Sequence, residues 1–155
     1  MRTQTRTLSR QRGQNLVELA VIMTALLLMV LGVIDLGRAL YIKVEVANAV
    51  RAGALYGAQG PSTAIDTAGI TYAVKNESAD LTGSFSTPTT SYFCQCVGGG
   101  TVTCGTSGGC GAAPQLGWLT VNAQVVYVPW FKIPYFGLPA SYLIKGSATV
   151  PVSGL

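Results

Sequence analysis

An uncharged apolar run near the N-terminus constrains this chain more than any other feature. Residues 19–34 contain no charged side chain, and with Leu16 and Val17 the apolar stretch reaches nineteen residues, interrupted only by Glu18. A helix of that length spans the hydrocarbon core of a bilayer, which is about 30 Å thick. The summed preference of leucine, isoleucine and valine for the bilayer offsets the cost of one acid near an end. We therefore predict a transmembrane segment over residues 14–36.

The distribution of charge predicts how this segment is oriented. The chain carries a net charge of +4, and residues 14–155 are balanced, so the excess comes from four arginines in the first thirteen residues: Arg2, Arg6, Arg10 and Arg12. By the positive-inside rule this basic leader, residues 1–13, lies in the cytoplasm and the rest of the chain outside. The partner expected from this pattern is membrane lipid. Nucleic acid is not expected, because the remainder lacks a basic surface.

A short motif joins the leader to the apolar run. Gly13 ends the basic leader, and Glu18 follows at the fifth position after it, a pattern that resembles a type IV prepilin processing site. The resemblance implies that a prepilin peptidase cuts between Gly13 and Gln14. A carboxylate at a helix N-terminus is favoured by the dipole, and a neighbouring amine could neutralise it, so Glu18 would set subunit register. The alternatives are a plain anchor with Glu18 at the headgroups, or, less favoured without an A-x-A site, a cleaved signal.

Three linked motifs are similar to one family. RGQNLVELA at residues 12–20, GVIDLGRAL at 32–40 and NAVRAGA at 48–54 resemble the TadE-like family, as do VVYVP and FGLP within residues 125–139. The resemblance is weak over residues 60–116. It implies a minor pilin or pseudopilin of tight-adherence (Flp) pilus assembly or a related secretion apparatus, with other pilins and pilus-assembly membrane proteins as partners.

The helix is predicted to continue beyond the membrane. Residues 37–59 contain no glycine-proline break, so we expect one helix over residues 15–57 with an extracytoplasmic extension. Asp35 and Arg38 stand three apart and can meet on its surface. We favour a local ion pair; the alternative is a helix interface with another subunit, to which Arg51 of the third motif would also contribute.

Residues 60–155 are expected to form an α+β domain. A second helix is predicted over residues 62–76, with an apolar side made of Ile65, Ala68, Tyr72 and Ala73. Alternation predicts strands over residues 91–97, 119–128 and 142–150. In the second of these strands, five side chains should point to the core: Leu119, Val121, Ala123, Val125 and Tyr127. The expected fold is pilin-like, with a long N-terminal transmembrane helix, a second helix and an antiparallel sheet of three or four strands.

The connection between the last two strands is rich in aromatic residues. It spans about residues 129–139 and carries Trp130, Phe131, Tyr135 and Phe136. A connection of that length suggests function, and clustered aromatic side chains mark interfaces or a membrane boundary when exposed. The alternative, that they close one end of the core, is slightly favoured.

Four cysteines lie in a glycine-rich loop, residues 94–111. Cys94 and Cys96 are too close together to pair, so we expect two disulfides linking them to Cys104 and Cys110, in either combination. Zinc binding is less favoured, because no C-x-x-C spacing and no histidine occurs.

The residue composition also argues against catalysis. The chain has no histidine and six acidic residues, so the commonest general base is missing, and Asp66, Glu77 and Asp80 fit a solvated helix side and its end. We expect no enzyme, no metal and no cofactor. The predicted function is that of a structural component in the bacterial cell (inner) membrane. The alternatives are a main filament subunit, or a membrane-anchored adhesin-like module whose leader stays uncleaved.

Overall fold

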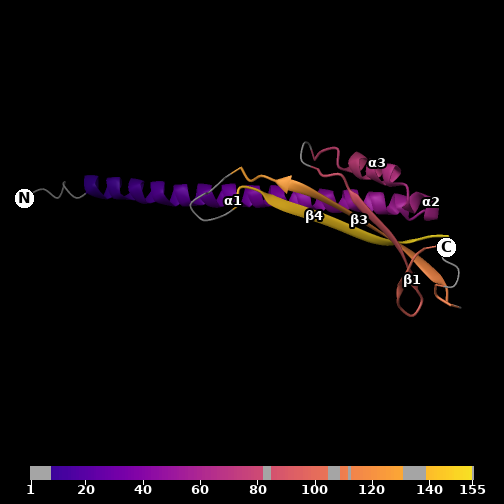
Figure 1. Cartoon of the computed structure of the whole chain (residues 1–155). Helices are drawn as coiled ribbons and strands as arrows, with labels where there is room; N and C mark the ends of the chain where they lie inside the picture. The colour runs from indigo at the N-terminus through magenta and orange to yellow at the C-terminus, as the bar shows by residue number, and fades with distance from the viewer. Residues whose placement is uncertain (1–7, 82–84, 105–108, 112, 131–138, 155) are drawn as a thin grey trace, which may run out of the picture. The chain divides into compact units, whose positions relative to one another are not determined.

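The computed structural model describes residues 8–81, 85–104, 109–111, 113–130 and 139–154. The chain forms two compact units, Met1–Arg38 and Ala39–Leu155. The first contains the apolar segment. The second contains the rest of the long helix, two further helices and a sheet (Figure 1). The predicted α+β architecture is thereby confirmed.

Helix α1, Leu8–Gly57, carries the apolar run. Its large apolar side chains between Leu16 and Ile34 are exposed, except for the half-buried Leu31, and the mean hydropathy along the helix reaches 2.6. Among the described residues this is the one helix long and apolar enough to cross a membrane. Exposed apolar area costs roughly 25 cal/mol per Å² in water, so this part of the helix fits a membrane anchor.

The predicted second helix is divided in two. The chain forms α2, Pro61–Ala64, and α3, Thr67–Glu77, separated by Ile65 and Asp66. The break occurs because the side chain of Asp66 caps α3 by accepting a hydrogen bond from the backbone N–H of Gly69. The break shifts the helical phase, so the expected apolar side is wrong: Ile65 and Tyr72 are exposed, and the buried residues are Ala64, Ile70 and Val74.

The sheet has four antiparallel strands in the order β2-β1-β3-β4. They are β1, Thr89–Cys96; β2, Thr101–Val102; β3, Gln115–Tyr127; and β4, Tyr142–Val152. The five inward side chains predicted on the longest strand, β3, are all buried. The short strand β2 was not expected.

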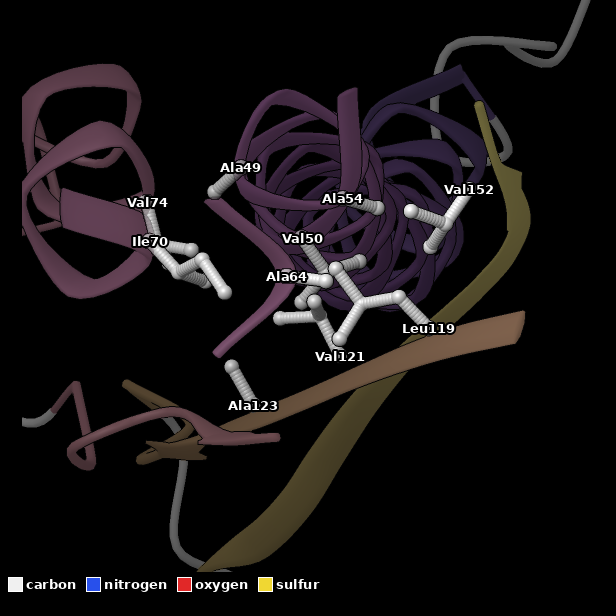
Figure 2. Close-up of a cluster of buried hydrophobic side chains, with 10 residues drawn as sticks. All are labelled: Ala49, Val50, Ala54, Ala64, Ile70, Val74, Leu119, Val121, Ala123 and Val152. Carbon is white, nitrogen blue, oxygen red and sulfur yellow. The ribbon is translucent and has the colours of Figure 1, made fainter. Parts of the chain in front are cut away.

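The core lies between α1, α3 and the sheet. Side chains from three elements make up most of its main cluster (Figure 2): Ala49, Val50 and Ala54 of α1, Ile70 and Val74 of α3, and Leu119, Val121 and Ala123 of β3. Small residues let these elements approach closely. A Cβ added at Gly53 would meet Val74, and one added at Gly57 would meet Leu119.

The two long strands run along α1 in opposite directions within the second unit. A Cβ at Gly146 would lie 2.8 Å from Cγ1 of Val46, and the N–H of Ser153 donates to the carbonyl of Ala58 at 3.0 Å, so β4 runs parallel to α1. Strand β3 is antiparallel to β4 and therefore to α1. Consequently β3 ends, and β4 begins, toward the end of the unit that starts at Ala39 (Figure 1).

Candidate functional site

The predicted processing position lies near the start of α1. Gly13 and Gln14 are exposed, and nothing lies within 4 Å of the place a Cβ would occupy at Gly13. Glycine weakens a helix by about 1 kcal/mol relative to alanine, so Gly13 is a point where the first turns open more easily.

Glu18 is exposed among apolar neighbours on the same helix. Leu16, Val17 and Leu19 around it are all more than half exposed. A carboxylate in lipid is costly unless it is paired or lies near the interface. Glu18 follows Gln14 by four residues and thus lies about one helical turn away. The described geometry is compatible with the predicted register role but does not test it.

Asp35 and Arg38 form an ion pair on α1. The Nη1 atom of Arg38 lies 3.5 Å from Oδ1 of Asp35, one turn apart. Surface pairs of this spacing contribute about 0.2–0.5 kcal/mol to a helix. This is the local pairing we favoured. Arg51 is exposed and lies in the second unit, whereas the pair lies in the first. A joint interface of the three residues stays a prediction.

The cysteines form two disulfides within the second unit. Cys94 pairs with Cys104 and Cys96 with Cys110, with Cα–Cα distances of 5.0 and 5.4 Å. A pairing between the two predicted groups is therefore confirmed, and sulfurs bonded in this way are not available as thiolate ligands for zinc. Cys94 is completely buried. The turn between β1 and β2 contains Gly98–Gly100 with positive φ, which glycine adopts readily.

The aromatic connection is described only at its beginning. Trp130 is 66% exposed. Phe131, Tyr135 and Phe136 lie outside the described residues. The interaction role predicted for these four residues is therefore not tested beyond Trp130.

A polar contact that sequence analysis missed joins α1 to the start of α3. The Oη atom of Tyr56 donates to Oδ2 of Asp66 at 2.8 Å, while Oδ1 of Asp66 accepts from the N–H of Gly69 at 3.0 Å. The bond from Gly69 and then that from Tyr56 lower the pKa of Asp66 below its usual value, and the bond to Asp66 raises the pKa of Tyr56. Asp66 is thus a capping residue and not merely part of a solvated helix side. An aspartate one residue before a new helical period was the available signal.

Two hollows lie on the second unit. One, of about 580 Å³, lies over α1 and α3 and is lined largely by small residues, with Tyr56 and Tyr72 at its sides. The other, of about 450 Å³, lies on the outer face of the sheet among hydroxyl and amide side chains such as Thr89, Asn122 and Gln124. Within the described residues, no group of three His, Cys, Asp or Glu side chains is placed to hold a metal ion.

The class of protein is defined by two features, an N-terminal apolar helix that fits a membrane anchor and a small disulfide-linked α+β unit. Residues 13–55 match the family model described as TadE-like protein, which confirms the resemblance to the TadE-like family. The match covers the predicted processing motif, the apolar run and most of the helical extension, and it indicates a component associated with Tad pili. Neither the curated proteins nor the solved structures include a match to this chain.

Proposed function

We propose that this chain is a minor pilin or pseudopilin, a structural component of a Flp/Tad-type pilus or related secretion apparatus. In this proposal α1 anchors the chain in the bacterial cell (inner) membrane, with the leader in the cytoplasm and the unit Ala39–Leu155 outside. The observation that carries it is the TadE-like match over residues 13–55, which includes the apolar run from Leu16 to Ile34 whose large side chains are mostly exposed.

The exposed apolar surface of α1 explains how such a component would act. Lipid covers a single apolar helix, but it also lets helices of other subunits pack against it through van der Waals contact and small residues. Ala20 and Gly32 offer such small positions on the exposed helix. Other pilins or pilus-assembly membrane proteins are therefore the partners we propose for α1.

Cleavage by a prepilin peptidase would give Glu18 its role. Cutting after Gly13 creates a new amino group on Gln14, and an amine from one subunit can neutralise the carboxylate of Glu18 in the next. A paired charge in lipid costs much less than an isolated one, so this contact would fix the axial register of adjacent helices.

A structural role also accounts for the chemistry of the second unit. The carboxylate of Asp66 is engaged in capping α3 and in binding Tyr56. The four cysteines are engaged in disulfides. These groups hold the fold together, and the proposed function requires no enzyme activity and no cofactor.

The test is the N-terminal sequence of the protein recovered from membranes. We expect the wild type to begin at Gln14 and a Gly13→Ala variant to retain its leader. Gly32→Ala is the matched control, because it makes the same change in the same helix, also with nothing within 4 Å. It should begin at Gln14. Intact leaders in all three proteins would contradict processing and favour a permanently anchored display module.

A second measurement distinguishes a minor component from the main filament subunit. Filaments sheared from cells should contain this chain at a small fraction of the amount of their major subunit, and deleting it should reduce the number of filaments. If the chain makes up the bulk of the sheared fibre, the minor role is wrong and the filament-subunit alternative replaces it.

A further inference from the structure

One end of the outer sheet surface is apolar. Val126 and Leu143 are partners in the β3–β4 register, and both point to the outer face because they alternate with inward-facing residues. They are 43% and 49% exposed. Three further exposed apolar or aromatic side chains lie just beyond them at the same end, and of these Tyr142 belongs to the inner face, because it alternates with Leu143 and pairs with the inward Tyr127. We call this group the proximal patch: Val126, Val128, Trp130, Tyr142 and Leu143.

The proximal patch lies at the end of the unit where the chain leaves for the apolar anchor. Val46 of α1 and Val125 of β3 belong to one buried cluster, with Ile144 packed against it. A strand advances about 3.3 Å per residue, so Val128 lies about 10 Å beyond Val125 in the direction of β3. The same distance along α1, at 1.5 Å per residue, leads back from Val46 to about Leu40. The patch and the beginning of the unit are therefore level.

Helix α1 adds apolar surface at this level. Leu40, Tyr41 and Val44 are all more than half exposed. The uncharged run ends at Ile34, six residues before Leu40 in the sequence. The end of the second unit that carries the patch is therefore the end that a few residues join to the apolar run.

We propose that the proximal patch contacts the surface of the bilayer that holds α1. Tryptophan and tyrosine favour the interface between lipid and water, and Trp130 and Tyr142 supply both. Lys145 is exposed on the same outer face, two residues after Leu143, and can reach lipid phosphate. The contact seats the second unit on the membrane. It rests on the anchoring part of the proposed function and not on the role in a pilus.

The rest of the outer face differs from the patch. Its middle is polar, as shown by Asn122, Gln124 and the hydrogen-bonded pair Thr120 and Thr149, whose oxygens are 2.9 Å apart. Trp118 lies on the same face but eight residues before Val126, about 26 Å away along the strand. Lipid at the patch should therefore not reach Trp118.

The chain's two tryptophans provide an internal comparison. We would reconstitute the full chain into vesicles of phosphatidylcholine with brominated or ordinary acyl chains, using Trp118→Phe to observe Trp130 and Trp130→Phe to observe Trp118. Bromine quenches a tryptophan only at short range. We expect fractional quenching of Trp130 to exceed that of Trp118 by about threefold or more, as for an interfacial side chain.

Two substitutions test whether the patch causes the contact. In the single-Trp130 protein, Leu143→Asp should reduce quenching to near the level of Trp118. Leu116→Asp is the matched control, because Leu116 is similarly exposed, at 47%, on the outer face at the far end. It should leave quenching of Trp130 unchanged. Equal effects of the two variants would overturn the proposal.

Flotation of the vesicles separates the failure of the patch from the failure of the anchor. If the chain floats with the vesicles but Trp130 is quenched no more than Trp118, the proximal patch does not contact lipid. The patch would then be a surface for another protein, and the anchoring would stand. If the chain does not float, both the patch and the proposed anchoring by α1 are wrong.

Discussion

Replacing Gly53 by alanine tests the close contact between α1 and α3. A Cβ at this position would meet Cγ2 of Val74 and would lie 3.3 Å from the carbonyl oxygen and from Cγ2 of Ile70. Ile70 and Val74 are both completely buried. The added methyl group has no free space, so α3 must move away from α1 by a few tenths of an ångström, or one of these side chains must leave its preferred rotamer.

Two opposing effects decide the sign of the change. Alanine is a better helix former than glycine by about 1 kcal/mol, which would stabilise α1. Forcing an extra carbon into a packed core costs about 1–3 kcal/mol. The cost is not relieved locally, because valine in a helix has one strongly preferred χ1 rotamer and a carbonyl oxygen of α3 is fixed by its own helix. The result is a net loss of about 1 kcal/mol.

The assay is thermal unfolding of the full chain in detergent micelles, followed by tryptophan fluorescence. A loss of 1 kcal/mol should lower the midpoint by about 4–8 °C for a unit of this size. Gly37→Ala is the control in the same helix, because nothing lies within 4 Å of its Cβ position and it belongs to the other unit. It should leave the midpoint unchanged. If Gly53→Ala raises the midpoint, helix propensity dominates and our account of the contact is refuted.

Two further predictions concern the links that hold the second unit together. Cys104→Ser removes the disulfide to Cys94, which closes a loop with a sequence separation of 10, and should lower the free energy of unfolding by up to about 3 kcal/mol. Urea denaturation measures this change, and an unchanged midpoint would show that the crosslink does not constrain the unfolded chain. Asp66→Ala should lower the thermal midpoint at neutral pH, because it removes the cap of α3 and the bond from Tyr56. The pKa of Asp66 is lowered in the folded protein, so its contribution is complete above about pH 4 and is lost as pH falls through the folded value. The difference in thermal midpoint between wild type and variant should therefore be constant from about pH 5 to 7 and narrow as the pH falls below about 4. A difference that does not narrow on acidification would contradict the role of the carboxylate.

Sequence analysis correctly predicted the parts of the fold in which the pattern of apolar residues allows one interpretation. The alternation of Leu119, Val121 and Ala123 has only one face that can be buried, and β3 buries it. The apolar run has no charge to interrupt it, so its helix was also evident. In both segments local pattern and tertiary environment agree, and neither prediction needed knowledge of a distant contact.

The parts that were missed depend on a helix cap and on the pairing of strands. Ile65 and Tyr72 were placed on the buried side because residues 62–76 were treated as one helical period, whereas the cap by Asp66 starts a new one. The disulfide partners could not be assigned because they follow from the turn that places β2 beside β1, with Val102 opposite Cys94. A strand of two residues carries too little pattern to be recognised. The aromatic connection after Trp130 remains a prediction.

The exposed residues of α1 indicate where partners other than lipid must act. Leu40, Tyr41 and Val44 lie at the end of the second unit that is joined to the apolar run. Leu55 is also more than half exposed, but it lies eleven residues beyond Val44, about 16 Å further along the helix. If the proximal patch contacts the bilayer as proposed, that distance is more than the thickness of the headgroup region, and lipid would not extend to Leu55. Because Leu55 lies within the TadE-like match and the chain's own core leaves it exposed, we expect a subunit of the assembly to cover it. Leu55→Asp should then reduce the number of filaments on cells without changing the quenching of Trp130. Leu143→Asp should instead remove that quenching. If Leu55→Asp leaves the number of filaments unchanged, Leu55 is not an assembly contact.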